Sequence, residues 1–370
     1  MADQKGESLD TAASTAGLFL YGWDGSGDWK VPADLIAAGR QLARNGSLSV
    51  AQRGMPTADN AYGIDGWRLL IENANGVVLT QDSADVPDGA GFAAKLVVGS
   101  GNNGKFGLFS PIENRDARQL RNKPVSLRVP LKATAGLVNG TGKIRVGILA
   151  FTGTADAVSG DPVSSWGAEG TNPTLAASWA FVNTPAAIAV TTSWADYLIE
   201  NVTIPANATN VAILIWSDDR ATTATTDILR IGGYVTLTRG AVAPPGLVLP
   251  FAEELARCQR YFQKTFPLAT APADGAGTAG AMTVVPLGAT GYLAYFWQFP
   301  RMRAAPTIVT YNPGVSGTAA YWRNAGDTTS SQPLLAGVGE NCATIYLNNA
   351  VSKAWTSEGW TIHATADADL

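Results

Sequence analysis

The residues that could carry chemistry in this sequence include one glycine-rich run. Gly99-Ser-Gly-Asn-Asn-Gly104 has the spacing of a dinucleotide-binding turn, and Lys105 follows it as a lysine does in a phosphate-binding loop. Both kinds of site need a helix to begin there, because amide groups at the helix N-terminus hold the phosphate. Gly107 and Pro111 come directly afterwards and break a helix. The sequence therefore predicts a turn between strands and no nucleotide site.

The single histidine and the carboxylate groups are the remaining candidates for catalysis. A Ser-His-Asp triad would have to be built on His363, and the chain has no Gly-x-Ser-x-Gly elbow. Glycosidases use paired carboxylates, but Asp82, Asp85 and Asp88, like Asp218-Asp219, lie in turn-rich stretches without the spacing of a calcium-binding loop. We therefore expect His363 to be a polar position on a strand, and the acidic groups to be solvated loops.

The cysteines and the overall charge exclude further classes. A structural zinc site normally takes four cysteine or histidine ligands, and the chain has only Cys258, Cys342 and one histidine. We expect the two cysteines to be separate buried thiols rather than a disulfide. The net charge of −4 argues against a nucleic-acid partner, which needs clustered Lys and Arg. No apolar run approaches the ~20 residues of a membrane span, and the polar N-terminus has no apolar signal core. We expect a soluble protein without cofactor, metal, nucleic acid or membrane insertion.

The pattern of apolar residues indicates a mainly β protein, in which 370 residues suggest two or three domains. Residues 1–44 predict a small hairpin, Leu18–Tyr21 with Trp29–Val31, and a short helix from Ala33 to about Ala43. Residues 45–240 alternate apolar and polar positions in about nine strands, which is typical of a jelly-roll sandwich. These strands are Leu48–Gln52, Trp67–Glu72, Val77–Gln81, Ala93–Val98, Val125–Leu131, Ile144–Phe151, Trp194–Ile204, Val211–Trp216 and Ile228–Thr238. Asn75-Gly76 predicts a hairpin turn between the second and the third of them.

A linker and one helix, residues 241–265, follow the jelly roll. Phe251, Leu255, Cys258 and Phe262 recur at helical spacing and form one apolar stripe. Residues 266–370 then predict a smaller β-sandwich. Its strands are Ala281–Pro286, Tyr292–Phe299, Thr307–Tyr311, Ala319–Arg323, Leu334–Val338, Ala343–Leu347 and Gly359–Ala364.

Aromatic residues are the main chemical resource, because aromatic faces stack on sugar rings. The chain has 11 tryptophans and 10 tyrosines. Trp67, Trp194 and Trp216 lie in strands, and we expect them in the core. The candidate carbohydrate-binding residues lie in turn-rich stretches or side by side on one strand: Trp166, Trp179, Tyr321 and Trp322. For each of them taken singly a core position is the stronger expectation, and the group as a whole favours a binding surface over a catalytic pocket.

Several segments, in a fixed order, resemble bacteriophage tail-fibre and related virion adhesion proteins. Ala252-Glu-Glu-Leu-Ala-Arg-Cys-Gln-Arg-Tyr-Phe262 is similar to the joint between domains in this family. Upstream, Asn45–Gly54 and Ile64–Trp67 resemble the opening of its carbohydrate-binding-module-like jelly roll. Downstream, Met302–Thr307 and Ala366–Leu370 resemble its C-terminal domain. The resemblance covers residues 45–370, and it supplies no catalytic motif.

The resemblance implies a fibre or spike subunit of a phage or phage-like particle that binds host-surface polysaccharide and is not an enzyme. Residues 1–44 would attach the chain to other virion proteins, and the chain would be located in the virion. Fibres of this kind are usually homotrimers, and the stripe of Phe251, Leu255, Cys258 and Phe262 could pack at a threefold axis or on its own chain. Two alternatives remain open: a polysaccharide depolymerase spike, and a collar or head decoration protein without receptor binding.

Overall fold

The computed structural model describes residues 40–73, 76–99, 104–137, 143–218, 227–284, 293–314, 322–324, 333–347 and 359–370, together with the backbone of 19–23 and 28–32. The last two segments form an antiparallel hairpin of β1 (Phe19–Trp23) and β2 (Asp28–Pro32). The helix predicted after Pro32 falls mostly outside the described residues. Its expected end does not form, because residues 40–43 are not helical.

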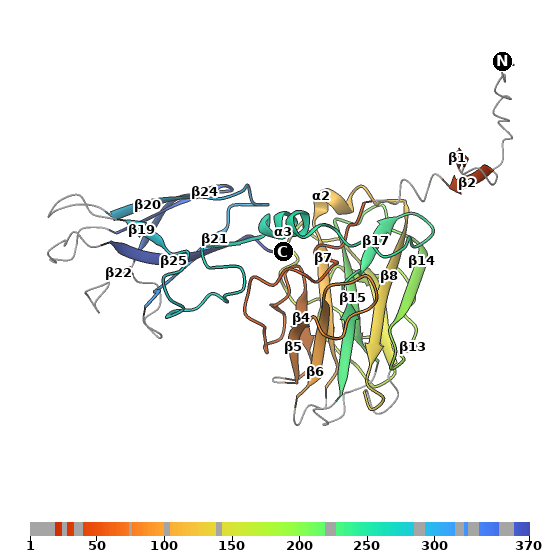
Figure 1. Cartoon of the computed structure of the whole chain (residues 1–370). Coiled ribbons are helices and arrows are strands. Elements are labelled where there is room, and N and C mark those ends of the chain that lie inside the picture. The colour runs from red at the N-terminus through yellow and green to blue at the C-terminus, as the bar shows by residue number, and fades with distance from the viewer. Residues whose placement is uncertain are drawn as a thin grey trace, which may run out of the picture.

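Two antiparallel sheets form the jelly roll between residues 40 and 240 (Figure 1). The seven-stranded sheet has the order β12 (Trp179–Phe181), β9 (Lys143–Phe151), β15 (Asn210–Ser217), β7 (Phe106–Ile112), β4 (Arg68–Ile71) and β3 (Ala61–Tyr62), with β13 (Ile188–Ala189) also paired to β9. The six-stranded sheet has the order β14 (Ala195–Thr203), β8 (Pro124–Ala133), β16 (Ile228–Gly232), β6 (Ala93–Val98) and β5 (Val77–Asp82), with β17 (Thr236–Arg239) also paired to β8. Alternate residues of both sheets meet in one apolar core that includes Trp67, Leu127 and Ile213. The predicted jelly-roll sandwich is confirmed.

Two predictions about local structure within the jelly roll are wrong. The hairpin expected at Asn75-Gly76 does not form, because β4 pairs with β3 and β7 while β5 pairs with β6 in the other sheet. The chain between β4 and β5 therefore passes from one sheet to the other. The expected strand Leu48–Gln52 is an irregular segment. The chain after the glycine-rich run continues as strand β7, so no helix begins there to hold a phosphate.

The chain then forms the predicted helix, α3 (Phe251–Gln259), which ends before Phe262; the short helix α2 (Asn114–Ala117) follows β7. In the described part of the chain, no helix has both the length and the apolar character needed to cross a bilayer. A further small hairpin, β10 (Val163–Ser165) with β11 (Thr174–Leu175), lies in the segment between β9 and β12.

The C-terminal β domain has two sheets around its own apolar core. One is built on the long strand β25 (Trp360–Asp367), which pairs with β18 (Phe262–Lys264), β19 (Met282–Val284), β21 (Thr307–Tyr311) and β22 (Arg323–Asn324). The other has the order β20 (Leu293–Gln298), β24 (Cys342–Leu347), β23 (Leu334–Gly339). His363 is a buried member of β25: it stacks on Phe266 at 3.9 Å, and its two ring nitrogens meet Thr265 Oγ1 and the carbonyl of Gly277. The two cysteines are both free, as predicted, but only Cys258 is buried, and Cys342 is half-buried.

The C-terminal end of the chain returns to the jelly roll beside α3 (Figure 1). Asp369 forms ion pairs with Arg44 at 2.6 Å and with Arg53 at 2.7 Å, and the hydroxyl of Tyr62 donates to the carbonyl of Leu370. We call this region, where residues 40–53, α3 and residues 366–370 meet, the joint. It fixes the C-terminal domain against the jelly roll.

Candidate functional site

The aromatic residues predicted to contact sugar do not form an exposed platform. Trp166 and Trp179 are 7% and 9% exposed, and Trp322 is completely buried. Tyr321 lies outside the described residues. Because a sugar can stack only on a ring that solvent reaches, the prediction is wrong for the three described tryptophans.

The segment between β9 and β12 explains the burial of two of these rings. It covers the outer face of the seven-stranded sheet and forms a second apolar layer with Leu214 and Trp216. Trp179 packs edge-on against Phe109 at 5.4 Å. Every residue of β15 is buried, because one of its faces lies in the sandwich core and the other lies under this covering segment. Trp322 instead belongs to the core of the C-terminal domain.

The predicted oligomerisation stripe is divided by the fold. Cys258 and Phe262 are buried within their own chain, so they cannot contribute to a threefold interface as predicted. Phe262 also lies beneath the guanidinium of Arg53, 3.9 Å from its ring centre. Phe251 is 46% exposed and Leu255 is half-buried, so this end of the stripe remains accessible.

The outer face of the six-stranded sheet carries the one partly exposed tryptophan among those whose side chains the structure describes, Trp194. Tyr197 and Ile199 on β14 point to the core, so Trp194, which has the opposite parity, points outward. The register across the sheet pairs Lys132 with Arg230, and Arg230 with Lys95. Trp194 therefore stands at the end of a row of cations. We call this surface the Trp194 face.

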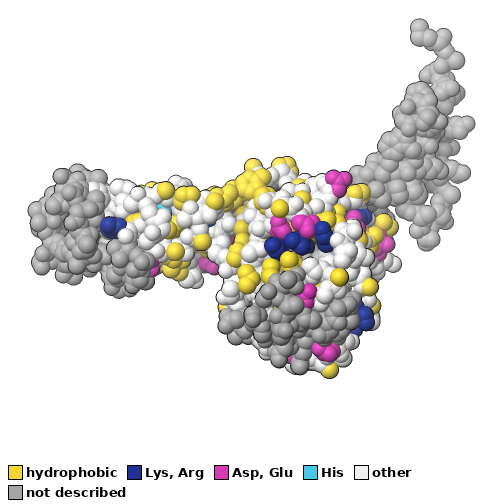
Figure 2. Space-filling view, turned by 60° about the horizontal axis from the view of Figure 1, so that its bottom comes forward, with side chains coloured by type: hydrophobic (Ala, Val, Ile, Leu, Met, Phe, Trp, Pro, Cys, Tyr) yellow, Lys and Arg dark blue, Asp and Glu magenta, His cyan; other side chains and the backbone are white. Residues whose placement is uncertain are grey.

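Two carboxylates from the end of β5 and the following loop tie this row together. The indole nitrogen of Trp194 donates to Asp85 at 3.0 Å, and the Lys132 ammonium lies 2.8 and 2.9 Å from the two oxygens of the same carboxylate. Arg230 Nε lies 3.1 Å from Asp82 and 3.3 Å from Asp85. Figure 2 shows acidic and basic side chains next to one another on one face of the jelly roll.

The electrostatics of this cluster favour ionised carboxylates. Partial burial works against the charge of Asp85, but hydrogen bonds from Lys132 and Trp194 and the charge of Arg230 outweigh it, so its pKa lies below the ordinary value. Burial also opposes the charge of Asp82, and the amide of Ala84 and the guanidinium of Arg230 overcome it, which lowers the pKa of Asp82. Both groups are hydrogen-bond acceptors at neutral pH, and neither is suited to be a general acid.

A second aromatic group lies on the same outer face. Tyr234 is half-buried and its hydroxyl bonds to Asp196, which forms an ion pair with Arg128. Burial and the negative charge of Asp196 raise the pKa of Tyr234 to about 12, so this hydroxyl stays protonated. Arg128 also donates to the carbonyl of Pro244, which holds the linker against this part of the sheet. The face thus offers two aromatic rings among fixed charged groups.

Sequence reasoning assigned Trp194 to the core, and one signal could have corrected this. Along Ala195–Thr203 the acidic residues Asp196 and Glu200 alternate with Tyr197 and Ile199. Trp194 shares its parity with the acidic residues, so the period of 2 places it on the solvent side.

Asp59 and Asp161 form a different kind of carboxyl pair. The pKa of Asp161 is raised to about 6. Its burial is the largest cause, and the neighbouring Asp59 carboxylate adds to the rise, while the amide of Val163 and the charge of Arg68 act against it. Arg68 also donates to the carbonyls of residues 158–160. The pair thus lies where the covering segment is fastened to β4.

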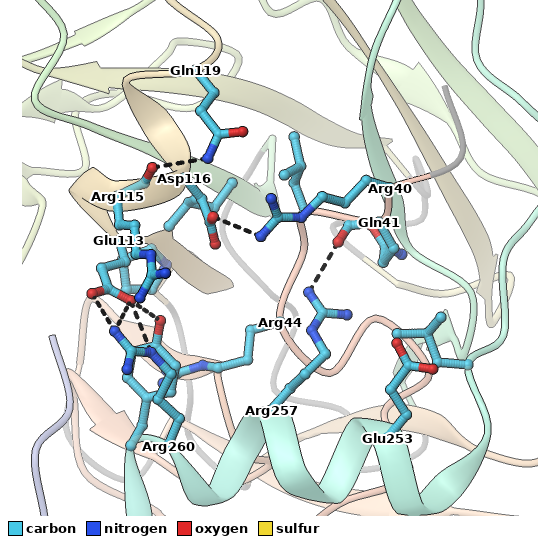
Figure 3. A pocket seen from close by; sticks show the side chains of 15 residues that line it. Arg40, Gln41, Arg44, Glu113, Arg115, Asp116, Gln119, Glu253, Arg257 and Arg260 are labelled. Carbon is cyan, nitrogen blue, oxygen red and sulfur yellow. Dashed lines mark hydrogen bonds and ion pairs between the residues drawn. The ribbon is translucent and has the colours of Figure 1, made fainter. Parts of the chain in front are cut away.

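A cavity of about 590 Å³ lies at the joint. Figure 3 shows its walls: α2 on one side, α3 on another, and residues 40–44 between them. Among the residues the structure describes, no group of three His, Cys, Asp or Glu side chains could hold a metal ion there or elsewhere.

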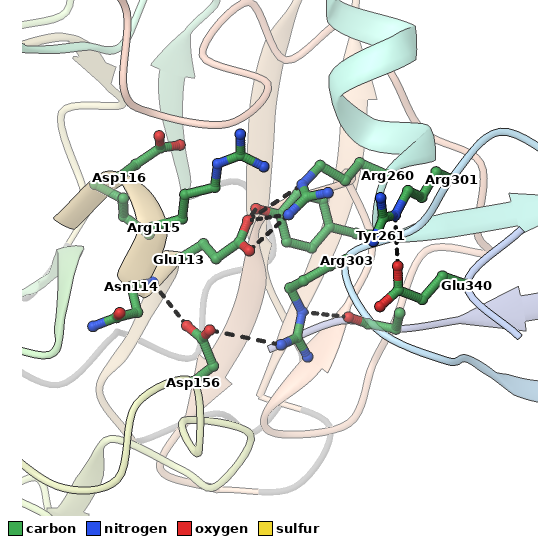
Figure 4. A network of polar contacts seen from close by, with 12 residues as sticks. Glu113, Asn114, Arg115, Asp116, Asp156, Arg260, Tyr261, Arg301, Arg303 and Glu340 are labelled. Carbon is green, nitrogen blue, oxygen red and sulfur yellow. Dashed lines mark hydrogen bonds and ion pairs between the residues drawn. The ribbon is translucent and has the colours of Figure 1, made fainter. Parts of the chain in front are cut away.

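Polar contacts beside this cavity join three parts of the chain (Figure 4). Arg260 of the joint approaches Glu113 with Nη2 at 2.7 and 3.0 Å from the two carboxylate oxygens, and the Tyr261 hydroxyl donates to Glu113 at 2.9 Å. Arg303 of the C-terminal domain donates to the carbonyl of Ala368 and lies 4.0 Å from Asp156 of the jelly roll. These contacts make the walls of the cavity rigid.

Comparisons with known proteins give structural similarity only. No family model and no curated protein matches the chain. Among solved structures, the enzymatically active domain of bacteriophage CBA120 tailspike protein 4 aligns at 12% identity and a TM-score of 0.31, over 50% of this chain and 21% of that chain. The module TmCBM61, in complex with β-1,4-galactotriose, aligns at 12% identity and a TM-score of 0.30, over 54% of this chain and 99% of that chain.

A further similar structure is the C-terminal family 22 carbohydrate-binding module of Clostridium thermocellum Xyn10B. It aligns at 9% identity and a TM-score of 0.29, over 53% of this chain and 99% of that chain. At such values the similarities carry no argument about function, which must come from the residues themselves.

Proposed function

We propose that the protein is a fibre or spike subunit of a phage or phage-like particle, and that it binds host-surface glycans through the Trp194 face. The observation that carries the proposal is the position of Trp194: a partly exposed indole on a rigid sheet, with its ring nitrogen bonded to Asp85. Such a ring offers an apolar surface to the C–H groups of a sugar. The carboxylates and cations beside it are acceptors and donors for sugar hydroxyls.

Binding without turnover fits the ionisation of this face. A glycosidase needs one carboxyl group that keeps its proton near neutral pH. Asp82 and Asp85 instead have lowered pKa values, and each is held by cations. The face is thus built to grip a ligand in one orientation.

The virion role is inferred from the sequence motif at Ala252–Phe262, which forms α3 and its continuation into β18. In this proposal residues 1–44 attach to other virion proteins, and several copies of the chain, as a homotrimer, bind one surface together. Each sugar contact is weak, and multivalency raises the effective affinity. The exposed Phe251 and half-buried Leu255 are the part of the stripe left for contact between copies. Sedimentation of the full chain tests this: a species of one chain mass at micromolar concentration overturns the homotrimer.

A binding experiment with a matched control tests the glycan site. Trp194→Ala should reduce binding of the purified protein to host cells, or to their isolated polysaccharide, about tenfold, which corresponds to about 1.4 kcal/mol. Phe296→Ala is the control, because it removes a 62% exposed ring from the C-terminal domain. Equal binding by both variants, with unchanged melting temperatures, would contradict the proposed site. Failure of the unmodified protein to bind any host glycan would favour a collar or decoration role.

Asp59 and Asp161 favour a second candidate function, that of a polysaccharide depolymerase. A carboxyl group with a pKa of about 6 beside a second carboxylate has the ionisation that a general acid needs. A reducing-end assay on host polysaccharide decides between the two functions. Release of oligosaccharide that is lost in Asp161→Asn would establish the enzyme; no release by the unmodified protein would exclude it.

A further inference from the structure

The cavity at the joint shares no residue with the Trp194 face and has a different chemistry. Five arginines line it: Arg40, Arg44, Arg115, Arg257 and Arg260. The three carboxylates in its wall are Glu113, Asp116 and Glu253. Cations therefore outnumber anions in the lining by two, in a protein whose overall charge is −4. The lining is therefore rich in guanidinium donors.

Two of the arginines already have partners that are part of the walls. Arg260 is held by Glu113, and Arg40 lies 2.8 Å from Asp116. These pairs keep both side chains in place. Two of the other three are paired with carboxylates that do not line the cavity, Arg44 with Asp369 at 2.6 Å and Arg257 with Glu254 at 3.6 Å, while Arg115 is an exposed cation.

The donors of these three arginines are incompletely satisfied. Nε and Nη1 of Arg44 and Nη1 of Arg257 are buried atoms without a hydrogen-bond acceptor. Nη2 of Arg44 forms an ion pair with Asp369, Nη1 of Arg257 lies 3.6 Å from Glu254, and Nη2 of Arg257 donates to the carbonyl of Gln41. The side chain of Arg44 is only 7% exposed. Arg115 is exposed, and its guanidinium contacts none of the described acceptors. Buried donors without acceptors are rare and costly, and an anionic ligand would satisfy them.

The remaining lining limits what kind of anion fits. Figure 3 shows Gln41 and Gln119 across the cavity from α3, and Glu253 on α3 one turn before Arg257. Amide and carboxylate oxygens accept hydrogen bonds from the hydroxyl groups of a ligand. Leu42, Ile112 and Leu249 supply apolar contacts. A volume of about 590 Å³ is within the range of small-ligand sites.

We propose that this cavity binds an acidic sugar unit, of the uronic acid type, with its carboxylate on Arg44, Arg115 and Arg257 and its hydroxyls on the amide groups of Gln41 and Gln119 and the carboxylate of Glu253. One carboxylate and several hydroxyls on a single ring match both halves of the lining. The site goes beyond the proposed function, because it does not depend on Trp194.

Calorimetric titration of the full chain at low salt tests this site. Sodium glucuronate should bind saturably, and glucose, which has the same ring without the carboxylate, should bind at least tenfold more weakly. Arg115→Gln should weaken glucuronate binding about threefold to fivefold, since Arg115 is an exposed cation whose loss leaves the fold intact. Arg118→Gln is the matched control, an exposed arginine next to α2 that does not line the cavity; it should bind as the unmodified protein does.

Three outcomes would overturn the proposal: no saturable binding of glucuronate, equal binding of glucose, or equal loss in Arg115→Gln and Arg118→Gln. Inorganic phosphate that binds as tightly as glucuronate would show a simple anion site and overturn the sugar. A hexaglutamate peptide that binds more tightly than glucuronate would overturn it in favour of a peptide partner. The same titration with Trp194→Ala separates the two sites, because glucuronate binding should be unchanged there whether or not the Trp194 face binds glycan.

Discussion

Asp369 gives the sharpest test of how the joint holds together. Its side chain is 7% exposed and sits between Arg44 at 2.6 Å and Arg53 at 2.7 Å. Burial opposes the charge of Asp369, and these two guanidinium groups outweigh it, so its pKa lies below the ordinary value. Asp369→Asn removes the negative charge that both arginines share while it preserves the shape of the side chain.

The magnitude follows from what the substitution leaves behind. Loss of one partner from a buried ion pair costs about 3–5 kcal/mol, because the other charge stays buried without compensation. Arg53 retains Asp367 at 3.2 Å, and Arg44 retains the ring of Tyr261, 3.8 Å from its guanidinium carbon. These remaining contacts place the expected loss at the lower end, about 3 kcal/mol.

The matched control is Asp367→Asn, two residues earlier in the chain and paired with Arg53, one of the two arginines that Asp369 contacts. The Asp367 side chain is 42% exposed, so its loss should cost less than about 1 kcal/mol. Urea unfolding of both variants, followed by tryptophan fluorescence, measures the difference. Equal shifts for the two variants would refute the argument from burial.

The pH dependence of the same variants provides an independent check. Because the folded-state pKa of Asp369 is depressed, its contribution is fully present above the unfolded value of about 3.9 and is lost as pH falls through the folded value. The unmodified protein should therefore lose stability more steeply than Asp369→Asn below about pH 4. Parallel acid-unfolding curves would contradict this.

Two further predictions concern other parts of the fold. Burial lowers the pKa of His363, although the hydrogen bond to the Gly277 carbonyl acts in the other direction, so the folded state resists protonation of this ring. Stability should therefore fall as the pH drops below about 6.5. In thermal melts, His363→Gln should reduce this dependence on pH, and an unchanged dependence would exclude His363 as its source. Gly232→Ala should lower the free energy of unfolding in urea by about 1–3 kcal/mol, because a Cβ there would lie 2.5 Å from a ring carbon of Pro87 and 2.9 Å from one of Pro130. The control, Gly91→Ala, should leave the free energy of unfolding unchanged, because nothing lies within 4 Å of its Cβ. A smaller loss for Gly232→Ala than for Gly91→Ala would mean that the loop that carries Pro87 moves freely.

Alternation of apolar residues was enough to predict most strands. Ala93–Val98 and Thr307–Tyr311 form over the predicted residues, and the apolar stripe from Phe251 gives α3. Strand β7 was missed because Gly107 and Pro111 argue against regular structure. A Cβ at Gly107 would lie 2.3 Å from the carbonyl oxygen of Ile215, so the glycine permits the close approach of β15. Strand β4 pairs with β7 only as far as Phe109. Pro111 lies beyond this point, so its missing N–H removes no hydrogen bond to β4.

The candidate sites depend on contacts between distant segments, which local patterns do not specify. Trp166 and Trp194 both lie near turns, and only the course of the chain between β9 and β12 buries the first while the second stays on an open face. The cavity at the joint combines Arg44, Arg115 and Arg257 from three separate parts of the sequence. No spacing rule connects such residues before the fold is known.

The way the C-terminal domain is attached has a mechanical consequence. The strand that enters this domain, β18, pairs with β25, the strand that leaves it, through Phe262 and Asp367. A force or torque applied to the sheet of β20, β24 and β23 is therefore transmitted to the jelly roll through two hydrogen-bonded strands and not through a single flexible linker. The two domains should therefore move together as one rigid unit. A force on the C-terminal domain should rotate the jelly roll instead of bending the chain between the two domains.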